Sequence, residues 1–184
     1  MIVSRQLRKK NIIEYLLYMW QVEDLLRGAQ LDADALATKV LAGAALPQST
    51  VTAWREWYSG LADMMRLEGV TETGHLGINN SILQEITELH KRLLELEAME
   101  QYKEKYYKAL PFIVEFRGKS GKKDCSEIES GLDFLYEIWL LKLQKRKISD
   151  QTQKVIDAIG GMLSMLAGYF VQYESGELDF DELE

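Results

Sequence analysis

Apolar residues recur at steps of three and four along most of the chain, which is the spacing of an amphipathic α-helix. The stripe is clearest in residues 49–68, where it consists of Val51, Trp54, Tyr58, Leu61 and Met65. No stretch alternates apolar and polar residues as a strand does, and no internal repeat is visible. The pattern predicts an all-α, single-domain bundle of about six or seven mostly antiparallel helices.

Capping residues and glycines mark the expected helix ends. The predicted helices cover about residues 4–27, 32–43, 49–68, 81–96, 101–117, 126–147 and 149–174. Asp32, Ser126 and Ser149 are residue types that accept hydrogen bonds from free first-turn amides, and Asn80 or Ser81 is the expected cap of the fourth helix. Gly28 and Gly69 are the expected stops, with Val70 folding back on the preceding turn.

The fourth and fifth helices need a break between them. A single helix over residues 81–117 would be about 55 Å long, whereas a compact domain of this size is only about 40 Å across. The apolar rhythm lapses between Glu97 and Gln101. We therefore place the break there and expect Pro111 to bend the following helix.

Charge is unevenly distributed over the 184 residues. The net charge is −7, and residues 174–184 carry six acidic and no basic side chains, which leaves −7 minus −6, or about −1, for the rest. We therefore divide the chain into a helical domain, 1–174, and an acidic tail, 175–184, in which Leu178, Phe180 and Leu183 are candidates to dock. A nearly neutral body predicts neither nucleic acid nor a membrane as partner.

The expected location is the cytoplasm. The single cysteine, Cys125, cannot form an internal disulfide and fits a reducing compartment. The basic N-terminus precedes an apolar run that Glu14 interrupts, without a small-residue cleavage site. Residues 155–173 approach the length of a membrane span, but Asp157 and Gln172 leave only the length of a buried core helix between them.

The two histidines, His75 and His90, are the first candidates for chemistry. A zinc site needs three or four ligands at controlled spacing, and His90 has Ile86 and Leu94 one turn away, so a hydrogen-bonded histidine at the edge of the core is the simpler interpretation. His75 lies in the loop Gly74-His75-Leu76-Gly77, where it is either functional or a loop anchor. No phosphate-binding glycine loop or nucleophile motif occurs, so we expect no cofactor and no metal.

Further candidates lie on helices. Trp57 lies off the main apolar stripe of its helix and is a candidate to line a groove or an interface. Asp133 and Glu137 are one turn apart on an otherwise apolar helix, where a solvated stripe is a simpler interpretation than an acid–base pair. Gly160, Ser164 and Gly168 repeat at four-residue steps, which permits close packing against a neighbouring helix, or a homodimer seam.

Three segments of the chain carry a family resemblance. They are the sequences NIIEYLLYMWQVEDL at residues 11–25, MRLEGV at 65–70 and YYKALPFIVEFR at 106–117. Together they resemble a family of small bacterial proteins classed as a domain of unknown function, and the likeness extends over about residues 1–173. The resemblance implies a bacterial cytoplasmic protein and brings no activity, ligand or site residue with it.

These observations leave three functional hypotheses. The first is a non-enzymatic interaction or scaffold protein that uses a helical face, as a homodimer or with another protein partner. The alternative is a small-molecule binder with an aromatic-lined pocket formed by Trp57, His75 and nearby tyrosines. An enzyme centred on His75 or on the Asp133–Glu137 pair comes third.

Overall fold

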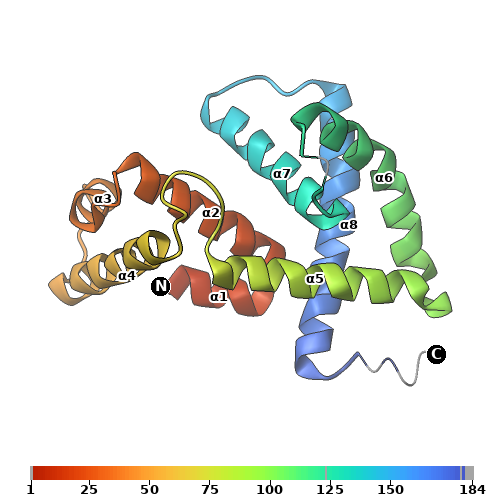
Figure 1. The fold of residues 1–184 in the computed structure, drawn as a ribbon, viewed down its shortest axis with the longest axis horizontal. Helices are drawn as coiled ribbons and strands as arrows, with labels where there is room; N and C mark the ends of the chain where they lie inside the picture. The colour runs from red at the N-terminus through yellow and green to blue at the C-terminus, as the bar shows by residue number, and fades with distance from the viewer. Residues whose placement is uncertain (1, 123, 179, 181–184) are drawn as a thin grey trace. The chain divides into compact units, whose positions relative to one another are not determined.

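The computed structural model of the chain describes residues 2–122, 124–178 and 180. Within these residues the chain forms α-helices and one short 3₁₀-helix, without a strand (Figure 1). The helices are α1 (Ile2–Lys10), α2 (Ile12–Gly28), α3 (Ala33–Val40), α4 (Gln48–Leu67), α5 (Gly77–Glu95), η1 (Glu97–Met99), α6 (Glu100–Ser120), α7 (Glu127–Leu143) and α8 (Asp150–Ser175). The all-helical prediction is confirmed.

The chain divides into two compact units, as far as its residues are described. The first unit comprises residues 1–8 and 14–81 and contains α3, α4, most of α1 and of α2, and the start of α5. The second comprises residues 9–13 and 82–184 and contains the rest of α5 together with α6, α7 and α8. The proposed boundary between a helical domain, 1–174, and a tail, 175–184, stays a prediction. Leu183 lies outside the described residues.

The first predicted helix is two helices in the structure. α1 and α2 are separated at Asn11, whose side-chain oxygen accepts a hydrogen bond from the Ile13 N–H at 3.1 Å. An asparagine that bonds the amide two residues ahead is a helix N-cap, so it starts a new helix instead of continuing the old one. The described residues therefore contain eight α-helices instead of six or seven.

Most predicted caps are present. Asp32 accepts from the Ala35 N–H at 2.9 Å, Ser126 from that of Glu129 at 3.1 Å and Ser149 from that of Thr152 at 3.1 Å. Gly69 adopts a φ of 72°, and the next N–H, of Val70, bonds the Met65 carbonyl at 3.0 Å. This is the expected glycine-ended last turn of α4.

The predicted start of the fourth helix is wrong. α5 begins at Gly77, ahead of the expected caps Asn80 and Ser81. A carboxylate from elsewhere in the chain does the capping, because Glu68 accepts the Gly77 N–H at 2.6 Å. Ser81 instead donates to the Gly77 carbonyl at 2.9 Å, inside the helix.

The predicted break after α5 is confirmed. α5 ends at Glu95, Leu96 is extended with φ −72° and ψ 127°, and η1 leads into α6 at Glu100. Pro111 lies inside α6.

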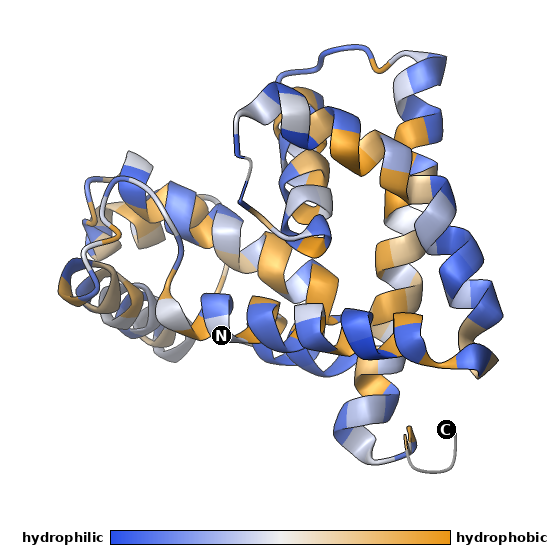
Figure 2. Ribbon diagram, turned by 45° about the vertical axis from the view of Figure 1, so that its right-hand side comes forward, coloured by the Kyte–Doolittle hydropathy of each residue, from blue (hydrophilic) through white to orange (hydrophobic). Residues whose placement is uncertain are grey.

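Apolar side chains of α2 to α8 are buried, and Figure 2 shows that most helices have a hydrophobic and a hydrophilic side. In the first unit α2, α3 and α4 contribute large buried residues, among them Leu16, Trp20, Leu36, Tyr58 and Met65. The large buried residues of the second unit include Leu93, Tyr102, Ile128, Leu163 and Phe170. These two cores position the candidate sites described next.

Candidate functional site

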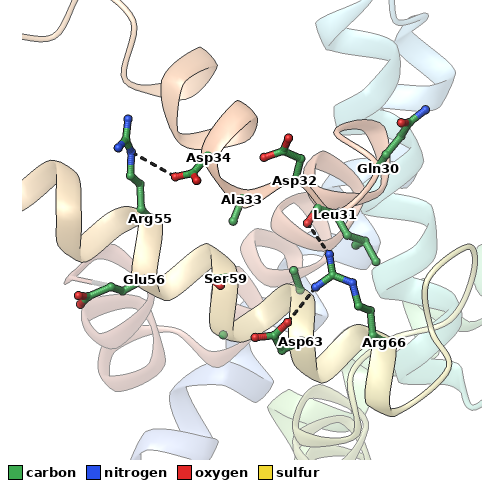
Figure 3. Close-up of a pocket in the computed structure, with 12 residues that line it drawn as sticks. Gln30, Leu31, Asp32, Ala33, Asp34, Arg55, Glu56, Ser59, Asp63 and Arg66 are labelled. Atoms are coloured by element: carbon green, nitrogen blue, oxygen red, sulfur yellow. Dashed lines mark hydrogen bonds and ion pairs between the residues drawn. The ribbon is translucent and has the colours of Figure 1, made fainter.

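A hollow of about 780 Å³ lies in the first unit beside α3 and α4. Figure 3 shows polar side chains from both helices around it. It is lined by Gln30, Leu31, Asp32, Ala33, Asp34, Arg55, Glu56, Ser59, Gly60, Ala62, Asp63 and Arg66. Its volume lies in the range of small-molecule sites, roughly 300–1,000 Å³. The lining contains no aromatic side chain, unlike the pocket of the alternative, small-molecule-binding hypothesis.

Each of the two arginines of this hollow pairs with a carboxylate, Arg55 with Asp34 at 3.5 Å and Arg66 with Asp63 (Figure 3). Arg66 bonds Asp63 at 2.8 Å and the Leu31 carbonyl at 2.9 Å. The Leu31 carbonyl belongs to a turn in which Gln30 and Leu31 both have positive φ, 55° and 61°, which is uncommon for side chains larger than glycine. Four carboxylates face two guanidinium groups, so the lining carries a formal charge of −4 plus 2, or −2. A cationic ligand suits such a lining.

A second polar cluster of the first unit surrounds Glu23, which is completely buried. One carboxylate oxygen accepts from the Leu76 N–H at 3.0 Å and from the Asn79 amide at 2.7 Å. The other lies 2.7 Å from Nδ1 of His75. A carboxylate accepts hydrogen bonds, so Nδ1 carries the proton. The buried carboxylate of Glu23 thus has three hydrogen-bond donors, as a buried acid requires. Its bond to Nδ1 holds the His75 imidazole in one orientation.

His75 is a loop anchor in this arrangement. Its ring stacks on Trp20 with centroids 4.2 Å apart, and its side chain is 25% exposed. Arg27 adds to the anchoring, since it donates to the carbonyls of Val70 and Gly74. The loop between α4 and α5 is therefore tied to α2 by side chains.

Glu23 was missed as a candidate, although the sequence contained a signal for it. It lies three residues after Trp20 and three before Leu26, both of which are buried, so helical spacing places it on the buried face. A carboxylate on an apolar face requires donors. The spacing alone does not reveal which donors these are, because they lie more than fifty residues away in sequence.

Trp57 belongs to a packed aromatic group. It stacks on Tyr18 with centroids 6.4 Å apart and contacts Trp54 edge-on at 5.5 Å. Neither Trp57 nor His75 lines the α3–α4 hollow, nor a second hollow, of about 260 Å³, in the other unit. The structure thus does not bring the two residues together in either hollow.

His90 is buried in the second unit, with 2% of its surface exposed. Its Nδ1 lies 2.6 Å from the Tyr102 hydroxyl, and Tyr106 contacts the ring edge-on at 5.0 Å. Burial lowers the pKa of His90 to about 4, with a smaller opposing effect from Glu127, so the ring is neutral at pH 7. Burial likewise raises the pKa of Tyr102. His90 is therefore a core histidine whose Nδ1 is hydrogen-bonded to Tyr102.

The carboxylates of α7 lie beside Cys125. In the described residues, Cys125, Glu129 and Asp133 have ligand atoms within 4.8 Å of one another. The Lys122 ammonium already occupies this cluster, 2.7 Å from Asp133. Burial raises the pKa of the Cys125 thiol and the two carboxylates raise it further, which opposes formation of the thiolate that metals bind. Burial, and then Asp133, raise the pKa of Glu137.

The small residues of α8 lie on an open face, which we name the α8 small face and define as Gly160, Ser164 and Gly168. Ser164 and Gly168 are exposed and Gly160 is half-buried. A β-carbon built on either glycine meets no described atom within 4 Å beyond its own neighbourhood in the helix. Within the described chain, therefore, no neighbouring helix packs closely against these glycines.

α8 is also the one helix of the described residues that is long and apolar enough to cross a membrane. Only a third of its most apolar window is buried. Core helices of soluble proteins have the same length and composition, so this is weak evidence for a membrane. It does show that α8 exposes more of its length than a core helix does.

The fold and these sites define an all-helical protein with two helical units, each of which contains buried polar side chains. The chain belongs to the family described as Domain of unknown function (DUF4924), whose model matches residues 1–177. No curated protein and no solved structure matches the chain.

Proposed function

We propose that the protein is a non-enzymatic interaction protein that forms a homodimer through the α8 small face. The observation that supports this proposal is the open space at Gly160 and Gly168, where a β-carbon would meet nothing within 4 Å. Glycine in a helix interior costs about 1 kcal/mol relative to alanine. Nothing described near these two positions requires the missing β-carbon, whereas a second helix lying close against the face would require it.

The spacing of the face suits a two-fold contact. Gly160 and Gly168 lie four residues on either side of Ser164. If the two-fold axis passes at Ser164, antiparallel copies of α8 bring Gly160 of each protomer opposite Gly168 of its partner. Small side chains at these positions let the two helix backbones approach closely.

Charge favours the antiparallel orientation. Asp157 and Val171 lie seven residues on either side of Ser164 and are both exposed. Parallel copies would place the two Asp157 carboxylates side by side, which is unfavourable. Antiparallel copies place each Asp157 beside Val171 of the partner and leave its carboxylate bonded to Gln153 at 2.8 Å.

The experiment is a measurement of mass by light scattering on the wild type and two variants. Ser164→Arg places a long charged side chain at the two-fold axis and should give a monomer. Ser59→Arg makes the same change on an exposed residue of α4 and should leave the dimer intact. If the wild type is monomeric at all concentrations, or if both variants behave alike, the proposal is wrong.

A second candidate function rests on the α3–α4 hollow. Its charge of −2 and its volume of about 780 Å³ suit a small cationic ligand such as a polyamine. Spermidine at millimolar concentration should raise the melting temperature of the wild type by mass action. Ser59→Arg, which fills the hollow and adds a positive charge, should abolish the shift, whereas Ser164→Arg should not. An equal shift for both variants would contradict binding in the hollow.

The cytoplasm remains the proposed location. The free thiol of Cys125 supports it, because cytoplasmic thiols are kept reduced.

A further inference from the structure

α8 ends in a turn at Gly176. Gly176 has a φ of 75° and donates its N–H to the Tyr173 carbonyl at 3.2 Å. The Glu177 N–H bonds the Gln172 carbonyl at 2.9 Å. These two bonds form the glycine-ended turn that terminates many helices.

Phe180 is buried in the second unit after this turn, with 7% of its surface exposed. Its ring contacts Tyr173 of α8 edge-on, with centroids 6.1 Å apart. The guanidinium carbon of Arg92, from α5, lies 3.6 Å from the centre of the ring. This is a cation–π contact. We name the surface formed by Arg92 and Tyr173 the Phe180 socket.

The Phe180 socket lies inside the region that the family model matches, whereas Phe180 itself lies outside it. Arg92 and Tyr173 lie within residues 1–177, which the family model matches, and Phe180 lies after them. The socket therefore belongs to the matched region, whereas the side chain that fills it comes from the segment beyond. In sequence, Phe180 is flanked by Asp179 and Asp181, and Glu182 follows. An aromatic ring among acidic residues is complementary to an exposed arginine.

We propose that the Phe180 socket is a binding site for an extended acidic segment of a partner protein that carries an aromatic side chain, and that the chain's own tail closes this site in cis. The tail is joined to α8 by a few residues, so its effective concentration at the socket is on the order of 1 mM. If such a segment binds in trans with a Kd on the order of 0.1 mM, the tail weakens a competitor about tenfold.

This site is independent of the proposed dimer. Tyr173 follows Ser164 by nine residues, and at about 100° per residue it lies on the opposite side of α8. A change in the socket therefore leaves the α8 small face as it is, and the two proposals can fail separately.

The test uses the full chain with Phe180→Ala, which empties the socket and keeps the acidic residues. The probe is a fluorescent peptide with the sequence of residues 174–184, and its binding is measured by fluorescence anisotropy. We expect the peptide to bind Phe180→Ala about tenfold more tightly than the wild type. A peptide with alanine in place of the phenylalanine should bind neither protein.

Two further substitutions in the Phe180→Ala background assign the binding to the socket. Arg92→Gln should weaken binding at least tenfold, because it removes the cation over the ring. Lys91→Gln removes the neighbouring exposed cation of α5, which pairs with Glu88 at 2.7 Å, and should leave binding within about twofold. Circular dichroism confirms that each variant is folded. Equal binding to Phe180→Ala and wild type, no binding to either, or equal effects of the two α5 substitutions would overturn the proposal.

Discussion

Replacing Gly160 or Gly168 by alanine should stabilise the folded monomer. Both glycines lie inside α8, and neither is among the described glycines with positive φ, so alanine fits the backbone. A β-carbon at either position meets no described atom within 4 Å. The change therefore gains helix propensity, about 0.8–1 kcal/mol each, without a steric cost.

Gly131 of α7 is the matched control. It is also a helical glycine, but it is buried, and a β-carbon there would lie 3.3 Å from Cγ2 of Ile159 and 3.4 Å from Cδ1 of Leu163. Adding a methyl group to a packed core typically costs about 1–3 kcal/mol. This cost offsets or exceeds the propensity gain, so Gly131→Ala should be neutral or should destabilise by up to about 2 kcal/mol.

The assay is urea unfolding followed by circular dichroism, at a protein concentration low enough to keep the chain monomeric. Each α8 variant should raise the free energy of unfolding by about 1 kcal/mol, which is about 2–4 °C in melting temperature for a chain of this size. The double variant should gain about 2 kcal/mol, because the two sites lie about 12 Å apart along the helix and share no contact.

A loss of stability in either α8 variant, comparable to that of Gly131→Ala, would refute the reasoning. It would mean that the added methyl group meets a packed neighbour, so that the α8 small face is already covered within one chain. The homodimer proposal would then lose the observation that supports it.

Three other predictions follow from the buried polar groups and the caps. The pKa of His90 is lowered to about 4 by burial, so the unfolded chain binds the proton first and stability should fall as the pH is lowered from about 6.5 to 4. This contribution is on the order of 3 kcal/mol, and His90→Gln should remove it from the pH dependence of urea unfolding. Glu23→Ala leaves three donors, two of them buried, without their acceptor and should cost about 3–5 kcal/mol in urea unfolding, whereas Glu23→Gln, which keeps one acceptor oxygen, should cost less. Ser126→Ala removes the bond to the Glu129 N–H and should lower stability by about 1 kcal/mol in thermal unfolding, against Ser120→Ala as a control that removes no N-cap.

Local features of the sequence predicted the helices well. Asp32, Ser126 and Ser149 cap helices because their side chains bond amides three residues ahead, and Gly69 ends α4 because it adopts positive φ. Asn11 shows the limit of periodicity. The apolar rhythm continues past it, and only its bond to the Ile13 amide reveals the break.

Features that join distant residues could not be predicted in the same way. Glu68 caps α5 nine residues further along, and Glu23 anchors a loop more than fifty residues away. The lining of the α3–α4 hollow consists of charged residues that look like ordinary solvated faces in sequence. Helical spacing identifies the face on which a residue lies, but it does not identify the partner that face will meet.

The mass of the wild-type chain in solution, measured by sedimentation equilibrium over a range of concentrations, tests the central claim most directly. The account predicts a species of twice the 21.2 kDa chain mass that dissociates on dilution and is lost in Ser164→Arg. A mass of 21.2 kDa at every concentration would contradict it.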